Sequence, residues 1–395
     1  MKKILWFLVP IFIFAFAIRF LAVWPANTIV GFDQARDLFD ARKIILNRDL
    51  RIIGPTAGNN ASLHHGVAFL YFIIPLIILG GGNPIWVVLW NNFFNAAVAV
   101  VLFFFARSLF KSTKAGLIAA FLTAVSYYFV QFSGWLSNPT VTLLTVPVFF
   151  WGLWEYSQGK KWGLPLASLF LGLSIQFELF FIYLIPTGLI LWFVLKPKLP
   201  NLKIFIYSLL AIAFSLSSMV LTEIKFQFAG VKSLLGAGGL IGGVERANFI
   251  KQFVERFFSA FSDTLLPNFQ NAGAVIAALL ILILIFKRQW FLLIYLFSPA
   301  LMLVLGYHNA PWFLIGLLPL LLIISVVNLT AVKNLPESPL PSTPSPILYI
   351  STLSGHGTMI GIGTNTALGP TGSAETKFHL TIHYPNPIKT KNISF

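Results

Sequence analysis

The sequence predicts an all-α polytopic membrane protein, and three features of its composition support this fold class. Of the 395 residues, 57% are hydrophobic and 10% are charged, whereas soluble domains carry about 25% charged residues. Runs of roughly twenty apolar residues follow one another, and each is long enough to cross a hydrocarbon core about 30 Å thick. Most lysines and arginines lie in short loops between these runs, which is typical of topology signals.

Charge and cysteine content narrow the function further. The net charge of +15 is by itself compatible with nucleic-acid binding, but its placement in short loops favours membrane topology, so we expect no nucleic-acid partner. The chain has no cysteine, which excludes disulfides, thiolate metal sites and cysteine nucleophiles. The N-terminal stretch "MKKILWFLVPIFIFAFAIRFLAVW" has a basic start, a long apolar run and no small-residue cleavage site. We therefore expect an uncleaved membrane anchor.

Ten apolar runs predict membrane spans. They cover residues 4–24, 84–106, 115–132, 139–156, 163–177, 179–195, 203–222, 272–286, 289–306 and 311–330. An eleventh apolar segment, "HGVAFLYFIIPLIILGG" at 65–81, is short, contains Pro75 and ends in glycines. We expect this segment to be re-entrant or interfacial, because backbone that does not span is tolerated at membrane depth where protein or water covers it.

The distribution of basic loops supports that reading of 65–81. Lys2 and Lys3 place the N-terminus in the cytoplasm. If 65–81 does not span, every short basic loop falls on the cytoplasmic side, and if it spans, all of them move outside. The basic residues concerned are Arg107, Lys111 and Lys114, then Lys160 and Lys161, then Lys196, Lys198 and Lys203, then Lys287 and Arg288, and Lys333. We therefore expect a multi-pass protein of the plasma (inner) membrane.

This topology divides the chain into a transmembrane core, residues 1–330, and a tail, residues 331–395. The core has two large outer loops, at about 25–83 and 223–271, and three small outer turns near 133–138, 178 and 307–310. The tail opens with the linker "NLPESPLPSTPSP" and continues with many threonines, glycines and serines. By the same parity, the tail lies in the cytoplasm.

The stretch "GFDQARDLFDARKIILNRD", residues 31–49, concentrates charge immediately after the first span. On a 3.6-residue period one face carries Asp33, Arg36, Asp37, Asp40, Lys43 and Asn47, and the other carries Ala35, Leu38, Phe39, Ala41, Ile45 and Leu46. This pattern predicts an amphipathic helix on the outer face of the bilayer. Its like-charged pairs, Asp33–Asp37 and Asp37–Asp40, would destabilise a helix that had only a structural role. Asp33 could, however, serve simply as the N-cap of the helix. A structural and a functional interpretation therefore both remain.

The order of these features resembles the GT-C glycosyltransferases of the family 39 type. These include protein O-mannosyltransferases, the aminoarabinose transferase of lipid A and bacterial relatives. Here "FDQARD" resembles the family's Asp-Glu pair, and "HHGVAFLYFIIP" resembles its re-entrant segment "HPPLYYYLLAP". The stretch "RSLFKSTKAGLIAAFLTAVSYYFVQFSGWLSNPT" is similar to the second and third spans and the outer loop after them. The likeness covers residues 1–200 well and the later spans in outline.

The resemblance implies transfer of a sugar from a polyprenyl-phosphate donor to a protein, lipid or glycan acceptor outside the membrane, with Asp33 as general base. Three departures stand out: Gln34 replaces the usual Glu, "HHG" replaces "HPP", and Ser137 and Asn138 stand where many members have a second acidic residue. Relatives that bind a divalent ion use a paired carboxylate there. We therefore expect metal-independent chemistry without a cofactor.

Such a reaction needs a carboxylate that takes a proton from the acceptor hydroxyl and cations that offset charge on the leaving phosphate. Besides Asp33, the substrate-binding candidates are Arg36, Asp37, His64, His65, Trp135, Asn138, Glu178, Arg246, Lys251, Arg256 and His308. Arg246, Lys251 and Arg256 are spaced for a basic stripe facing the phosphate. The alternative is that the glutamates at 245 and 255 simply pair with them. Glu178 is costly at the end of a span unless it has a partner.

Two other classes of function remain as alternatives. One is a transporter or flippase of lipid-linked sugars. Transporters concentrate broken helices and polar sites near the membrane midplane, whereas this chain concentrates its charges in outer loops, which favours chemistry at the surface. The other is an inactive membrane scaffold, which Gln34 and the missing second acidic residue leave open.

The lack of cysteine allows a direct test of the topology. Single cysteines introduced as Ser62→Cys and Ser112→Cys are predicted to lie on opposite sides of the membrane. An impermeant thiol reagent added to intact cells should label position 62 and leave position 112 unlabelled until the membrane is permeabilised. Labelling of both positions in intact cells would show that 65–81 spans.

Overall fold

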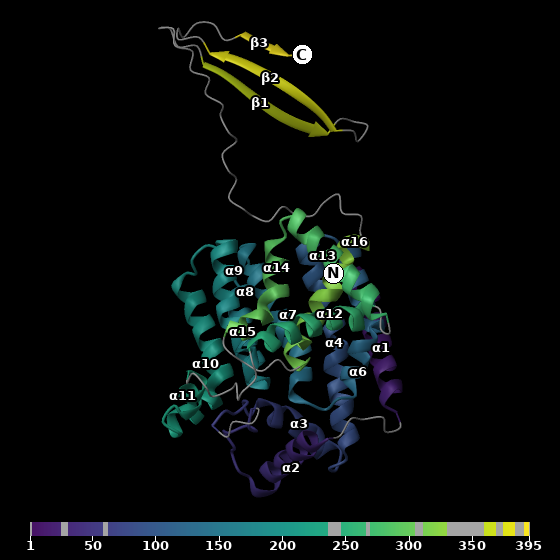
Figure 1. The fold of residues 1–395 in the computed structure, drawn as a ribbon, viewed down its shortest axis with the longest axis vertical. Coiled ribbons are helices and arrows are strands. Elements are labelled where there is room, and N and C mark those ends of the chain that lie inside the picture. The colour runs from purple at the N-terminus through teal and green to yellow at the C-terminus, as the bar shows by residue number, and fades with distance from the viewer. Residues whose placement is uncertain are drawn as a thin grey trace. The chain divides into compact units, whose positions relative to one another are not determined.

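The computed structural model describes residues 2–24, 31–57, 62–235, 246–265, 269–304, 311–329, 359–368, 374–383 and 391–394. The chain divides into two compact units, Met1–Ser338 and Pro339–Phe395. The first is built from helices and the second contains strands (Figure 1).

The first unit contains α-helices joined by short 3-10 turns. Its α-helices are α1 (Lys2–Val23), α2 (Phe32–Asn47), α3 (Ala68–Leu79), α4 (Pro84–Phe110), α5 (Thr113–Val125), α6 (Tyr127–Ser133), α7 (Asn138–Ser157), α8 (Gly163–Phe177), α9 (Leu184–Leu195), α10 (Leu202–Lys225), α11 (Ala229–Leu235), α12 (Arg246–Leu265), α13 (Gln270–Phe286), α14 (Trp290–Phe297), α15 (Leu301–Val304) and α16 (Leu318–Leu329). The 3-10 turns are η1 (Leu179–Tyr183), η2 (Ser298–Ala300) and η3 (Pro311–Leu317).

The second unit departs from the expected all-α fold. Strands β1 (Met359–Leu368), β2 (Ala374–His383) and β3 (Lys391–Ser394) form an antiparallel sheet in the order β1-β2-β3. In its register, Thr364 of β1 faces Phe378 of β2. The alternating stretch "KFHLTIHY" lies largely in β2, and alternation with a period of two is the pattern of a strand.

The apolar helices confirm a helical membrane protein. Three described helices are long and apolar enough to cross a bilayer: Trp6–Val23, Pro84–Phe110 and Leu202–Lys225. Helices α5 and α6 pass the same test together, although they are bent by 55° at the break between them. Shorter apolar helices of 10–17 residues include Gly163–Phe177 and Leu179–Leu195. The expected count of ten spans stays a prediction.

Local sequence explains where several helices begin. Helix α4 starts at Pro84, and the Asn83 side chain accepts a hydrogen bond from the backbone N–H of Ile85 at 3.1 Å. Proline is favoured at the first helical position, and asparagine satisfies the amides that a helix start leaves open. Ser112 caps α5 in the same way through the Ala115 N–H, at 3.3 Å.

Small residues let helices α7 and α8 approach closely. A Cβ atom added to Gly163 would lie 2.5 Å from the Gly152 carbonyl oxygen, so neither helix has room for a side chain at this crossing. Membrane helices associate through such small residues because close backbone approach increases van der Waals contact. This crossing packs the start of α8 against α7, and the candidate site lies at the opposite end of α8, beside Glu178.

Arg19 of α1 is fully buried and stabilises the break between α5 and α6. Its Nη2 donates to the Thr123 carbonyl at 3.0 Å, and its Nη1 donates to the Ala124 carbonyl at 3.1 Å. Its Nε donates to Asn95 Oδ1 of α4 at 2.7 Å. The last carbonyls of a helix lack partners within the helix and carry partial negative charge. Arg19 therefore joins α1, α4 and the end of α5 without needing a carboxylate.

Helices α2 and α3 pack together at one end of the first unit (Figure 1). Phe69 and Ile73 of α3 lie in one apolar cluster with Ala41 of α2, Val87 of α4 and Phe177 of α8. Helix α3 has 12 residues and is therefore about 18 Å long, which is shorter than a hydrocarbon core of about 30 Å. Its proposed re-entrant placement fits this length.

Replacing Arg19 should destabilise the helical unit. In Arg19→Met, the carbonyls of residues 123 and 124 lose their buried donors. We expect the free energy of unfolding to fall by about 1–3 kcal/mol. Leu21→Met changes an exposed side chain on the same helix (69% exposed) and should have little effect. Denaturant unfolding in detergent, followed by tryptophan fluorescence, measures both, and equal stability of the two variants would contradict the role given to Arg19.

Candidate functional site

Helix α2 is amphipathic, but it is rotated relative to the sequence prediction. Its buried residues are Gln34, Asp37, Ala41 and Ile44. Phe39 and Leu46, expected on the packed face, are 58% and 68% exposed. The expected polar face is thus wrong for Asp37, which is buried because Arg36 compensates its charge. Gln34 also turns inward, and its Oε1 accepts a hydrogen bond from the Gly31 N–H at 2.8 Å.

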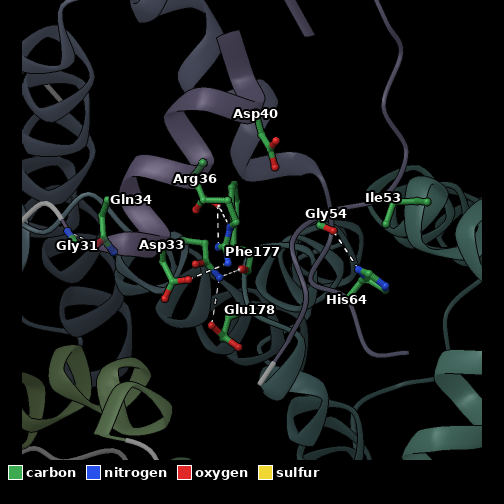
Figure 2. A network of polar contacts seen from close by, with 12 residues as sticks. Gly31, Asp33, Gln34, Arg36, Asp40, Ile53, Gly54, His64, Phe177 and Glu178 are labelled. Atoms are coloured by element: carbon green, nitrogen blue, oxygen red, sulfur yellow. Dashed lines mark hydrogen bonds and ion pairs between the residues drawn. The ribbon is translucent and has the colours of Figure 1, made fainter. Parts of the chain in front are cut away.

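Arg36 joins an exposed carboxylate to a buried one (Figure 2). Its Nη1 lies 2.7 Å from Asp33 Oδ1, while Nη2 and Nε lie 2.9 and 3.0 Å from Asp37 Oδ1. The Asp33 side chain is 64% exposed and that of Asp37 is 3% exposed. Burial raises the pKa of Asp37 to about 6, Arg36 opposes that rise, and Asp33 and Asp40 add to it. Asp33 therefore stands at the surface with a cation fixed behind it.

The other end of α2 is tied to the loop that follows it. Arg51 Nη1 lies 2.8 Å from Asp40 Oδ2, and its Nε donates to the Ile53 carbonyl at 3.0 Å. The Tyr71 hydroxyl of α3 donates to the Arg51 carbonyl at 2.9 Å. Arg51 was not among the predicted site residues. Its only sequence signal is that it lies two residues beyond the charged stretch 31–49.

His64 and His65 point to different partners because a short antiparallel bridge precedes α3. Thr56 pairs with His64, and the His65 N–H donates to the Pro55 carbonyl at 2.9 Å. Successive side chains in extended backbone point to opposite faces. The His64 ring lies 3.1 Å from the Gly54 carbonyl, away from the Asp33–Arg36 pair (Figure 2). Of the two histidines, only His65 reaches the helical core.

His65 meets Glu178 at the break between α8 and η1. His65 Nδ1 lies 3.3 Å from Glu178 Oε1 and accepts a hydrogen bond from the Leu179 N–H at 3.2 Å. Asn138, the first residue of α7, donates to Glu178 Oε2 at 3.2 Å and to the Phe177 carbonyl at 2.6 Å. The sequence singled out His65, Asn138 and Glu178 separately, and the fold brings them together.

Burial makes both ionisable groups of this cluster neutral at physiological pH. It raises the pKa of Glu178 to about 8, although hydrogen bonds from the Phe180 N–H and Asn138 oppose the rise. It lowers the pKa of His65 to about 3, and the positive charge of Arg36 lowers that pKa further. The contact is therefore a close approach of two neutral side chains rather than an ion pair. The effect of Arg36 also shows that the α2 network lies near enough to act on the imidazole.

Close packing fixes the loop that carries His65. A Cβ atom on Gly66 would lie 2.7 Å from the Gln176 carbonyl oxygen, and one on Gly54 would lie 2.3 Å from the His65 carbonyl oxygen. From α10, the Thr222 hydroxyl donates to the Ile52 carbonyl at 2.9 Å. These contacts leave the loop little freedom to shift relative to α8 and α10.

The turn that carries Trp135 is held by a residue that sequence reasoning did not identify. Asn91 of α4 is buried and donates to the Ser133 and Trp135 carbonyls at 3.0 and 3.3 Å. Its Oδ1 accepts a hydrogen bond from the Thr140 hydroxyl at 3.1 Å. The Trp135 ring packs against that of Phe132. The available signal was "NNFFN", a run of asparagines inside an apolar helix.

The cations expected to form a stripe on α12 point in different directions. Lys251 is 75% exposed and lies 3.9 Å from Glu255, as the alternative reading proposed. Arg256 instead borders a cavity of about 230 Å³, together with Tyr128 and Phe132 of α6 and Leu314 and Ile315 of η3. A step of five residues turns a helix by about 140°, so these cations cannot share one face.

Two of the predicted site residues add nothing to this geometry. The side chain of Arg246, at the start of α12, and the whole of His308 lie outside the described residues.

No family model and no curated protein matches the chain. The function must therefore be inferred from the residues themselves. The likeness to GT-C enzymes is thus a hypothesis. Within the described ranges, no three His, Asp or Glu side chains gather into a group that could hold a metal ion. Metal-independent chemistry stays a prediction.

The buried carboxyl of Asp37 should make the free energy of unfolding depend on pH. Its pKa is raised from the usual 3.8 to about 6, so between these values the unfolded chain loses a proton that the folded protein keeps. Stability from this group therefore falls as pH rises from about 4 to about 6 and is constant above. Asp37→Asn should lose less stability across that window in thermal unfolding, and the exposed Asp49→Asn should follow the wild type. Parallel curves for Asp37→Asn and wild type would contradict the assignment.

Proposed function

We propose that this protein is an integral membrane glycosyltransferase with a GT-C type fold. It moves a sugar from a polyprenyl-phosphate donor to an acceptor on the extracytoplasmic face of the membrane, with Asp33 as general base. The observation that carries this proposal is the arrangement at the start of α2. There the exposed carboxylate of Asp33 is held at 2.7 Å by Arg36, which the buried Asp37 fixes from behind.

This arrangement suits proton abstraction at a surface. A general base must come within hydrogen-bond reach of the acceptor hydroxyl, and Asp33 is 64% exposed. It must also be held in one orientation, which Arg36 provides because three of its nitrogens are bonded to Asp33 and Asp37. Asp37 therefore acts through Arg36, while Asp33 alone of the three is open to an incoming substrate.

A second cation suits the phosphate of the donor. Arg256 Nη1 is buried and has no hydrogen-bond partner among the described residues, and it borders the cavity lined by Phe132, Leu314 and Ile315. A cation beside apolar side chains matches a phosphate attached to an isoprenoid chain, and fixed positive charge stabilises a phosphate leaving group. Phe132 packs against Trp135, and Asn138 follows in the same turn, so one short segment connects this cavity with the Glu178 cluster.

Exposed apolar residues support the placement of α2 on the membrane surface. Phe32, Phe39 and Leu46 are 83%, 58% and 68% exposed. They are seven positions apart and therefore share one face of the helix. Lys43 lies over the Phe39 ring, 4.5 Å from its centre. An apolar stripe beside basic residues is typical of a helix in the headgroup region, where a lipid-linked sugar would reach Asp33.

The surroundings of Arg19 favour this proposal over transport. Among the described residues it is the one lysine or arginine whose whole side chain is buried, and its hydrogen bonds go to helix carbonyls and to Asn95. A charge bound in this way supports a helix junction and does not line a path for a substrate. A flippase of lipid-linked sugars and an inactive scaffold are the outcomes that the following experiment separates from catalysis.

Purified protein in nanodiscs should release polyprenyl phosphate from one member of a panel of polyprenyl-phosphate sugars. Asp33→Asn should reduce turnover by at least about a hundredfold, since general bases contribute roughly 10²–10⁴-fold, and should leave donor binding intact. Asp49→Asn, an exposed acid beyond the end of α2, is the matched control and should turn over normally.

Binding of the same donors tests whether the cavity beside Arg256 of α12 holds the donor phosphate. Arg256→Gln should weaken donor binding, whereas Lys251→Gln, which removes an exposed cation from the same helix, should not. If no donor is turned over, or if Asp33→Asn and wild type turn over equally, Asp33 is not the base. The protein would then be reconstituted into sealed liposomes, and transport of the donor from one leaflet to the other would identify a flippase.

A further inference from the structure

The exposed side of α2 carries an apolar stripe. Phe32, Phe39 and Leu46 are exposed, and because they are seven positions apart they follow one line along the helix. The buried residues Asp37 and Ala41 lie about 160° from Phe39 around the helix axis. The stripe formed by Phe32, Phe39 and Leu46, called here the α2 stripe, therefore points away from the side that packs on the protein, and the described residues leave it uncovered.

Two cations flank the α2 stripe. Arg42 and Lys43 are exposed, and they lie about 60° and about 40° from Phe39, on opposite sides of it. Lys43 Nζ lies 4.5 Å from the centre of the Phe39 ring. Neither cation forms an ion pair with a carboxylate among the described residues. Their aliphatic stems can therefore cover the edges of the stripe while their charges stay free for an external partner.

The acids of α2 do not neutralise this surface. Asp33 and Asp40 lie about 100–120° around the helix from the α2 stripe. They are engaged by Arg36 at 2.7 Å and by Arg51 at 2.8 Å, respectively. The remaining exposed acid of this region, Asp49, follows the end of the helix. The charge directly beside the stripe is therefore positive.

We propose that the α2 stripe binds the bilayer and that Arg42 and Lys43 select lipids with anionic head groups beside it. An apolar stripe between two free cations complements acyl chains that lie beneath a layer of phosphate groups. A second copy of this chain fits less well. A symmetric dimer would place the same patch on both partners, and the two pairs of cations would repel each other.

This contact would also set the rotation of α2 relative to the membrane. Asp33 lies about 120° from the α2 stripe around the helix, so lipid contact along the stripe keeps its carboxylate out of the acyl chains. The inference takes from the proposed function the location of α2 at the membrane surface, and it adds the lipid partner. It does not depend on the reaction that Asp33 carries out.

The cysteine-free chain allows a direct measurement of this contact. Ala35 is exposed and lies about 40° from Phe39, so a thiol-reactive fluorophore on Ala35→Cys reports on the α2 stripe. The labelled full-length protein is placed in phosphatidylcholine nanodiscs. A small, equal fraction of lipid then carries a nitroxide near the head group, on either phosphatidylglycerol or phosphatidylcholine. The ratio of the two quenching efficiencies measures the local enrichment of the anionic lipid.

We expect both lipids to quench the fluorophore, and phosphatidylglycerol to quench it more. Arg42→Gln and Lys43→Gln should each lower the enrichment by up to about fivefold, and the double variant should bring the ratio close to one. High salt should lower the ratio in the same direction, because it screens exposed charges. Lys251→Gln removes an exposed cation from α12 and is the control that should leave the ratio unchanged.

Each other outcome overturns a defined part of the proposal. Equal quenching by the two lipids overturns the selection of anionic head groups, and an unchanged ratio in the double variant overturns the role of Arg42 and Lys43. Absence of quenching by either lipid shows that the α2 stripe does not contact the bilayer and overturns the whole inference. Donor turnover by the wild type and by Asp33→Asn still decides the proposed reaction in each case.

Discussion

The contact between His65 and Glu178 joins the loop that precedes α3 to the helical unit, and the placement of the candidate site depends on it. His65 is held by the Leu179 N–H at 3.2 Å and by Glu178 at 3.3 Å. Gly66 is packed so closely against α8 that no side chain fits there. Because α2 and α3 pack on each other and on Phe177, this anchor also fixes the position of α2. The position of Asp33 therefore depends on the contacts that His65 makes, although His65 lies far from Asp33 along the chain.

Charge in this region is arranged from exposed to buried. Asp33 is open to solvent, Arg36 is partly covered, and Asp37 and Glu178 are buried. Burial favours the neutral form of a carboxyl, and the pKa values of Asp37 and Glu178 are raised to about 6 and about 8. The fold thus keeps the Asp33 carboxylate exposed, while the two deeper acids are buried against polar partners.

Away from the site, backbone groups inside the helical unit also need hydrogen-bond partners from within the protein. A bilayer core offers no water to an exposed carbonyl or amide. Arg19 serves the carbonyls at the α5–α6 break, and Asn91 serves those of the next turn. Arg256 Nη1 is one of several buried polar atoms that have no hydrogen-bond partner in the described residues, and it belongs to a cation. Because Arg256 also borders a cavity, that cavity is a candidate for an anion.

The sequence alone determined the membrane class, because composition and apolar run length depend only on the chain. It also located α2, since residues 31–49 contain the observed helix Phe32–Asn47, and it singled out Asp33, His65, Asn138 and Glu178 one by one. Only the tertiary structure decided that Asp37 is buried, that His64 and His65 diverge, and that His65 meets Glu178. Periodicity describes the faces of one element, whereas these partners lie far apart in the chain and are brought together by packing. Arg51 and Asn91 were missed for the same reason.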